Sequence, residues 1–223
     1  MKGVARKQVR RKQLAIVDWR MGNIGSVVNA LEYIGCHARL TCNKDELRKS
    51  DGIILPGVGA FENAMENLKA LDLIRFLAEQ VIEKKKPFLG ICLGMQVLGV
   101  HSEENGFHKG LGWLGGPVKR LTVQKGLRLP HMGWNDVRVK EQTPLFEGMS
   151  GDRNFYFVHS YHLICDPTYV VATCCYGEEF SAVVQKDNIV GTQFHPERSH
   201  TNGLQFLRNF VQLALIEKEA SAC

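Results

Sequence analysis

The sequence predicts an α/β fold in which a mostly parallel central sheet is flanked by helices, with antiparallel strands added in the C-terminal half. Two observations support this prediction. Strand-like and helix-like segments alternate four times in the first half of the chain, and such alternation is typical of parallel sheets covered on both faces. Beyond Gly110 short β-rich segments follow one another between turn residues, which indicates antiparallel pairing in the same sheet or in a smaller side sheet.

The first half of the chain contains four short, strongly apolar segments that we expect to be buried strands, at residues 14–17, 38–41, 52–55 and 87–91. A helix is expected after the first strand, because apolar residues from Ile24 to Ile34 recur at helical spacing and Gly35 can end it. Residues 62–83 predict one broken helix or two, and a further helix is expected from Cys92 to about Val97.

The second half predicts six strands and one helix. The strands are expected at 118–124, 134–139, 154–158, 169–174, 181–185 and 189–193, and the helix at about 202–216. The sequence contains no internal repeat and no low-complexity linker. We therefore expect a single domain over residues 13–223, preceded by a basic, disordered tail over residues 1–12.

Composition excludes several classes of protein. The chain has 223 residues, of which 44% are hydrophobic and 23% charged, as in ordinary globular proteins. The formal charge is +5, but six of the 28 basic residues lie within the first 13 positions, leaving 22 basic against 23 acidic residues. The folded part is thus close to neutral, which argues against a nucleic-acid-binding face. No run of about 18 apolar residues predicts a membrane-spanning helix.

The seven cysteines favour a reducing compartment. Their number is odd, and no Cys-x-x-Cys pair and no secretory signal is present, so a disulfide framework is not expected and a cytoplasmic location is. The histidine pairs His159/His162 and His195/His200 suggest metal ligands, but no cysteine or carboxylate stands at ligand spacing beside them. We expect no metal and no cofactor.

The strongest chemical signal surrounds Cys92, in the segment Phe88-Leu-Gly-Ile-Cys-Leu-Gly-Met-Gln96. A buried strand ends, a nucleophile follows, and a helix begins, with Gly90 and Gly94 two residues to either side. This is the pattern of a nucleophile elbow, with sulfur in place of a hydroxyl. The start of the helix favours a thiolate at Cys92, and the backbone N–H of Leu93 is placed to face a developing oxyanion.

A base for this nucleophile is expected near the C-terminus, in Gly191-Thr-Gln-Phe-His-Pro-Glu197. The strand would carry His195 to the sheet edge at which Cys92 emerges, and Glu197 could hold the imidazole in one tautomer. The segment Pro56-Gly-Val-Gly59 follows another strand. The peptide at Val58 and Gly59 could supply a second oxyanion donor, although an ordinary turn explains these glycines equally well.

Together these motifs resemble the class I (triad) glutamine amidotransferases. The stretches 18–23, 56–61, 130–135 and 156–161 further resemble the glutaminase subunits of imidazole glycerol phosphate synthase, and the match runs from about Gln13 to Leu215. Arg20 departs from that pattern. The resemblance implies a flavodoxin-like sheet and hydrolysis of L-glutamine through a thioester on Cys92, with His195 and Glu197 as its partners.

The resemblance also implies roles for residues around the nucleophile. Val58, Gly59 and Leu93 would form the oxyanion hole. Gln96 would bind the substrate, Glu104 would meet its amino group, and backbone groups of Ser160 and Tyr161 would hold its carboxylate. Ammonia would pass to a (β/α)8-barrel cyclase subunit that makes imidazole glycerol phosphate in histidine biosynthesis, forming a heterodimer. Asn23, Trp134 and Asn135 are candidates for the docking face, with a core aromatic as the alternative for Trp134.

Other functions stay open at this point. A related glutaminase could feed ammonia to another synthase, such as one making an amino sugar for a surface polysaccharide, because the chemistry at Cys92 would be the same. A cysteine hydrolase or peptidase on a similar sheet is a second alternative, disfavoured by Gln96, Glu104 and the His-Ser-Tyr segment at 159–161. A non-catalytic binding protein is a third, disfavoured by the intact Cys92, His195 and Glu197.

Overall fold

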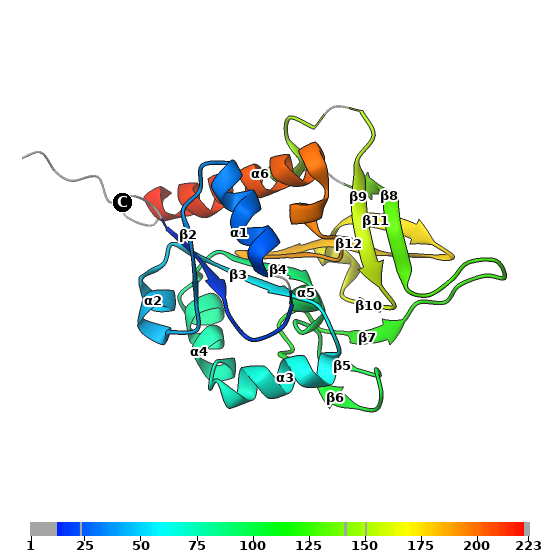
Figure 1. Ribbon diagram of the computed structural model, residues 1–223, viewed down its shortest axis with the longest axis horizontal. Coiled ribbons are helices and arrows are strands. Elements are labelled where there is room, and N and C mark those ends of the chain that lie inside the picture. The colour runs from blue at the N-terminus through cyan, green and yellow to red at the C-terminus, as the bar shows by residue number, and fades with distance from the viewer. Residues whose placement is uncertain (1–12, 23, 141, 150, 221–223) are drawn as a thin grey trace, which may run out of the picture.

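The computed structural model describes residues 13–22, 24–140, 142–149 and 151–220 (Figure 1). The tail predicted for residues 1–12 lies outside this range. The described residues form strands β1 (Leu14–Val17), β2 (Ala38–Thr41), β3 (Gly52–Gly57), β4 (Phe88–Cys92), β5 (His101–Ser102), β6 (His108–Lys109), β7 (Pro117–Arg120), β8 (His131–Val139), β9 (Asn154–His159), β10 (Tyr161–Leu163), β11 (Val170–Tyr176), β12 (Glu178–Lys186) and β13 (Ile189–Thr192).

The α-helices are α1 (Ile24–Tyr33), α2 (Lys44–Lys49), α3 (Phe61–Ala70), α4 (Ile74–Ala78), α5 (Leu93–Gln96) and α6 (His200–Ala220). A π-helical turn, η1 (Glu79–Glu83), continues α4, and three short 3-10 helices are η2 (Pro144–Phe146), η3 (Pro167–Tyr169) and η4 (Pro196–Arg198). The predicted break within residues 62–83 is confirmed, since α3 ends at Ala70 and α4 begins at Ile74.

The main sheet has nine strands in the order β2-β1-β3-β4-β13-β12-β11-β8-β9. The first five run parallel, and β12, β11, β8 and β9 pair antiparallel beyond them. A second sheet joins four short strands in the order β10-β7-β5-β6. The predicted α/β fold is confirmed, and both arrangements considered for the C-terminal strands are present at once.

The alternation of side chains along the parallel strands divides the core into two layers. On β1, Leu14 and Ile16 join the cluster that contains Val27 of α1 and Phe206 of α6. Ala15 and Val17 face the other way and join Phe61 of α3 and residues of α4. Figure 1 shows α1 and α6 on one side of the sheet and α2, α3 and α4 on the other. Burial on both faces explains why these strands are continuous apolar runs in the sequence.

Helix α2 has no counterpart among the helices expected from the sequence. This six-residue helix is charged, and only Leu47 is buried, so it has no apolar periodicity to detect. Its start is nevertheless marked, because the side chain of Asn43 accepts hydrogen bonds from the N–H groups of Asp45 and Glu46. The buried Lys86 ammonium donates to the carbonyls of Leu47 and Ser50 at the other end of the helix.

That residues 13–223 form a single domain stays a prediction. Within the described ranges, no helix combines the length and the apolar composition that crossing a membrane requires. The six cysteines of the described part of the chain are free thiols.

Candidate functional site

Cys92 lies at the sharp turn between β4 and α5, at the carboxyl end of the parallel strands. Its backbone has φ 53° and ψ −106°, a combination outside the regions that L-residues favour. Such strain persists only where the surroundings impose it, and it is concentrated at functional sites. The side chain is 5% exposed. The predicted nucleophile elbow is therefore present in the geometry.

Two glycines make this turn possible. A Cβ built on Gly94 would lie 1.7 Å from the carbonyl oxygen of Leu55 in β3, and one built on Gly90 would lie 2.5 Å from the carbonyl oxygen of Gly94. The backbone of α5 thus packs directly against β3 and β4, with no room for side chains between them. This close approach fixes the position of the first turn of α5, which begins directly after Cys92.

His195 follows β13, the strand next to β4, and the registers Gly191↔Gly90 and Thr192↔Ile91 carry both chains to the same edge. Its Nδ1 lies 2.8 Å from Oε1 of Glu197, and both side chains are only 4% exposed. Because the carboxylate accepts a hydrogen bond from Nδ1–H, the other ring nitrogen, Nε2, is left to act on the sulfur. Nε2 is buried and makes no hydrogen bond of ordinary geometry to the described residues.

The pKa of His195 is raised above its ordinary value. Burial opposes the imidazolium, but interaction with Cys92, followed by the hydrogen bond and charge of Glu197, outweighs it. Among the groups around the ring, Cys92 is the one that raises the pKa of His195 most.

A cavity of about 240 Å³ opens beside Cys92. At ~30 Å³ for each water this is room for roughly eight water molecules, or one small polar ligand. Its lining contains every predicted oxyanion and substrate residue together with the nucleophile: Val58, Gly59, Cys92, Leu93, Gln96, Glu104, Ser160 and Tyr161, with Pro130, Val158 and His159. A larger cavity, of about 710 Å³, is lined by residues between Val139 and Arg153, and neither Cys92 nor His195 is among them.

The loop predicted to complete the oxyanion hole is fixed by packing. Trp19 is fully buried and its Nε1 donates to the carbonyl of Pro56. A Cβ on Gly57 would lie 2.5 Å from the indole ring of Trp19. Gly59 has φ 113°, which a residue with a side chain rarely adopts. Gly57 pairs with Cys92 across β3 and β4, so the peptide at Val58 and Gly59 lies in the wall of the same cavity as Leu93.

Two polar side chains reach the cavity from other elements. The carboxylate of Glu104 accepts a hydrogen bond of 2.8 Å from the N–H of Phe61, the first residue of α3. A negative carboxylate in the cavity wall suits a ligand with an ammonium group. Nε2 of Gln96 donates to the carbonyl of Tyr161 at 2.8 Å, so its amide is bound to the protein in this structure.

The segment from His159 to Tyr161 is held by a pair of buried histidines. Nδ1 of His159 lies 2.9 Å from the carbonyl oxygen of Tyr161, and Nε2 lies 3.1 Å from Nδ1 of His131. Burial lowers the pKa of His131 to about 4 and that of His159 to about 3. Both rings are therefore neutral at pH 7. Because the Tyr161 carbonyl can only accept, neutral His159 carries its proton on Nδ1. Its Nε2 then accepts a hydrogen bond from Nδ1–H of His131.

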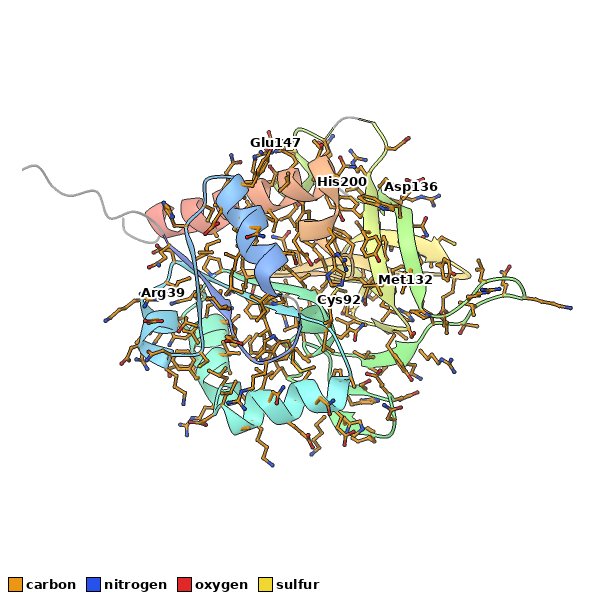
Figure 2. The ribbon with its side chains drawn as sticks, in the orientation of Figure 1. Arg39, Cys92, Met132, Asp136, Glu147 and His200 are labelled. Carbon is orange, nitrogen blue, oxygen red and sulfur yellow. The ribbon has the colours of Figure 1, made fainter. Side chains whose placement is uncertain are left out.

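Trp134 and Asn135 point to opposite faces of β8. Trp134 is 44% exposed and stacks on His200, with ring centroids 4.7 Å apart, so the alternative of a core aromatic is wrong. Asn135 instead donates to the carbonyl of Cys175 in β11 at 3.0 Å. Figure 2 shows Met132 and Asp136, which share the face of Trp134, along this strand. Asn23 lies outside the described residues.

The histidines considered as metal ligands have other partners. His162 lies 3.6 Å from Glu178, and His200 packs on Trp134. Within the described ranges, no group of three or more His, Cys, Asp or Glu residues could hold a metal ion. Two polar residues at the site, His131 and Gln193, were not expected from the sequence. Strand alternation was the available signal for Gln193, because it lies two residues before His195.

Known proteins resemble this chain over nearly its whole length. Residues 15–213 match the family model described as glutamine amidotransferase class-I. A relative in Campylobacter jejuni, strain RM1221, named imidazole glycerol phosphate synthase subunit HisH 1, is 45% identical over 90% of this chain and 100% of its own length. A Bacillus cereus (strain G9842) protein named imidazole glycerol phosphate synthase subunit HisH is 47% identical over 88% and 93%.

Two solved structures share the fold. One, described as a glutamine amidotransferase, has a TM-score of 0.70 at 21% identity and covers 90% of this chain and 98% of its own. The other, described as PurLQS from Thermotoga maritima, has a TM-score of 0.71 at 22% identity and covers 91% and 99%. At this identity the likeness concerns the fold alone.

Proposed function

The chain belongs to the class-I glutamine amidotransferase family, and from this premise we propose that it is the glutaminase subunit of an imidazole glycerol phosphate synthase. The observation that carries the proposal is the agreement of two findings. Relatives with that name are 42–47% identical over most of the chain, and the cavity beside Cys92 is lined by all the residues expected to form the oxyanion hole and to bind the substrate.

In the proposed reaction, the sulfur of Cys92 attacks the side-chain amide carbon of glutamine. The C–N bond breaks, His195 donates a proton to the departing nitrogen, and ammonia leaves a thioester behind. Water, deprotonated by His195, then attacks the thioester carbon, and the C–S bond breaks to release glutamate and regenerate the thiolate. Water and glutamine are consumed, and glutamate and ammonia are produced, without a cofactor.

The geometry supports roles for the residues around the sulfur. The N–H of Leu93 at the start of α5 and the peptide at Val58 and Gly59 lie on the cavity wall, where fixed donors stabilise the oxyanion of both steps. Glu197 orients His195 through Nδ1. Glu104 would meet the substrate ammonium, and Ser160 and Tyr161 its carboxylate.

The partner in this proposal is a (β/α)8-barrel cyclase subunit, which would form a heterodimer with the chain and use the ammonia. Ammonia becomes protonated and loses its nucleophilicity in bulk water, so direct transfer favours a docking face close to Cys92. The exposed side of β8 meets this requirement, because Met132 pairs with Val158 of the cavity wall and is 63% exposed. We place this reaction in a reducing cytoplasm, in keeping with the free cysteines.

The decisive experiment measures glutamate production by the chain alone, with the cyclase subunit, and with that subunit plus an analogue of its substrate. We expect stimulation of about 5- to 150-fold on assembly, the range of typical coupling energies. Equal rates for the isolated chain and the loaded complex would contradict a dedicated synthase subunit.

A second candidate is a glutaminase that serves another synthase, for example in amino-sugar synthesis. Several relatives carry a copy number in their names, among them HisH 1 in Campylobacter jejuni and HisH 2 in Vibrio vulnificus and in Pseudomonas aeruginosa. Numbered copies within one organism leave room for different partners. Affinity capture from the native cell separates the two candidates, since recovery of a synthase other than the cyclase would favour the second.

Replacing Glu104 by glutamine is expected to weaken substrate binding. The substitution removes the charge that would face the substrate ammonium, while an amide oxygen can still accept the hydrogen bond from Phe61. Hydrogen bonds to charged groups contribute about 1.5–3 kcal/mol, so the KM for glutamine should rise roughly 10- to 100-fold, with a smaller change in kcat. Glu103→Gln is the matched control, because Glu103 pairs with Lys119 on the surface. The KM of this variant for glutamine should equal that of the wild type.

Replacing Glu197 by glutamine is expected to lower kcat by roughly 10²- to 10⁴-fold, as loss of the group that orients a catalytic imidazole does in other triads. Glu197 is one cause of the raised pKa of His195, so its loss lowers that pKa. The alkaline limb of the pH–rate profile should therefore move to lower pH. Glu178→Gln, at the histidine–glutamate pair outside the cavity, should leave the profile in place.

A further inference from the structure

We propose that Gln193 is a further residue of the reaction centre, whose side-chain amide donates a hydrogen bond to the sulfur of Cys92 and stabilises its thiolate form. Neither the elbow nor the His-Pro-Glu segment assigns it this role. The inference deepens the proposed function and rests on it only for the reaction that the thiolate performs.

The placement of Gln193 follows from strand alternation. Gln193 lies two residues before His195, so in an extended chain their side chains leave on the same face. The main-chain N–H of Gln193 still donates to Ala182 of β12 at 2.9 Å, which keeps this alternation beyond the end of β13. Nε2 of Gln193 lies 3.6 Å from Sγ of Cys92, and the residue is 0% exposed.

The hydrogen bonds around Gln96 decide which end of the Gln193 amide faces the sulfur. The carbonyl of Tyr161 can only accept, so the group of Gln96 that lies 2.8 Å from it is the nitrogen Nε2. That same nitrogen lies 3.3 Å from the amide of Gln193, which must present its oxygen there. The amide nitrogen of Gln193 is then left for Cys92. A reversed amide would set two NH2 groups against each other.

The chemistry of the sulfur makes this donor useful. Sγ also lies 3.9 Å from the carbonyl oxygen of Val158, which can accept from a thiol but repels a thiolate. A buried anion is costly unless hydrogen bonds and an opposite charge compensate it. His195 supplies the opposite charge, and Gln193 supplies an N–H that offsets the effect of the Val158 carbonyl.

The consequence is a change in the balance between thiol and thiolate. Hydrogen bonds to a charged acceptor are stronger than those to a neutral one, so the amide favours the thiolate of the free enzyme over the thiol. The amide of Gln193 also links Gln96 to the nucleophile, because its oxygen accepts from Gln96 and its nitrogen donates to Cys92. Loss of the donor should therefore reduce the reactivity of Cys92 without glutamine being present.

The test is the pH dependence of Cys92 alkylation by iodoacetamide in the full-length chain, followed by peptide mass spectrometry to separate Cys92 from the other cysteines. In Gln193→Met, which keeps the length of the side chain and removes the donor, the midpoint should rise by about one pH unit, and the rate below the midpoint should fall about tenfold. Gln193→Glu should raise it further, because a carboxylate repels the thiolate.

Gln80→Met is the matched control, because Gln80 is also buried and its Nε2 bonds to Glu79 away from the cavity; its alkylation midpoint should equal that of the wild type. A folded Gln193→Met chain with an unchanged midpoint overturns the proposal. If that variant does not fold, the wild-type chain with ¹⁵N-labelled glutamine amides decides. The Gln193 resonance should shift when Cys92 is alkylated, and an unmoved resonance overturns the proposal.

These readouts need neither glutamine nor a partner, so they separate this inference from the proposed function. If the midpoint is shifted in Gln193→Met but the wild-type chain releases no ammonia even with the cyclase subunit and the analogue of its substrate, Gln193 is supported as a donor and the proposed function is contradicted. Ammonia release by the wild-type chain, together with an unshifted midpoint in Gln193→Met, would support the proposed function and contradict the role of Gln193.

Discussion

Replacing Cys92 by alanine should abolish ammonia release from glutamine, with a fall in kcat of at least about 10⁴-fold. The reason is chemical, since the thioester path requires a sulfur at the turn between β4 and α5, and no other described cysteine lines the cavity. The measurement is glutamate production in the complex with the proposed cyclase subunit, where the wild-type rate is expected to be highest.

Stability separates the loss of chemistry from unfolding. Alanine keeps the strained backbone at position 92, so the free energy of unfolding of Cys92→Ala should stay within about 1 kcal/mol of the wild-type value. Cys92→Gly should be equally inactive but about 1 kcal/mol more stable than Cys92→Ala, because glycine tolerates φ 53° without strain. Undiminished ammonia release by the alanine variant would refute the proposed nucleophile.

Replacing Gly94 by alanine should cause the largest loss of stability. The added Cβ would lie 1.7 Å from the carbonyl oxygen of Leu55, and that oxygen belongs to the backbone of β3 in the centre of the sheet. Neither the helix nor the strand can move without breaking contacts with its neighbours. We expect the free energy of unfolding to fall by more than about 4 kcal/mol, measured by urea denaturation, with activity lost as well.

Gly112 provides the control for this prediction. It has φ 71°, and a Cβ built on it would meet no atom within 4 Å. Gly112→Ala should therefore cost only the strain of a left-handed backbone, about 1–2 kcal/mol, and leave activity intact. Equal losses for the two variants would mean that backbone conformation, and not the close packing of α5 against β3, determines the effect at Gly94.

Local sequence signals predicted the parallel half of the fold and the elbow. The apolar runs at 14–17 and 87–91 are short, uninterrupted and bounded by turn residues, because both faces of these strands are buried. The two glycines around Cys92 are visible in the sequence because no other residue fits so close to β3 and β4. Helix α2 carries no such signal, since its stability comes from caps and from the Lys86 side chain.

The antiparallel half was less predictable. The strands after Gly110 were expected, but their number, their bounds and their division between two sheets depend on pairing across long stretches of chain. Strand β8 begins at His131, three residues before the predicted start at Trp134, because His131 pairs with His159 across β9. The opposite directions of Trp134 and Asn135 follow from the same pairing.

By itself, the sequence determined the kind of chemistry at this site, because a nucleophile elbow, a histidine followed by a carboxylate and a glycine loop each occupy a few adjacent residues. Only the tertiary structure decided which distant side chains meet around the sulfur. The contacts of Gln193 with Cys92 and of His131 with His159 join residues 101 and 28 positions apart. Such contacts arise from the order and register of strands, which no local pattern encodes.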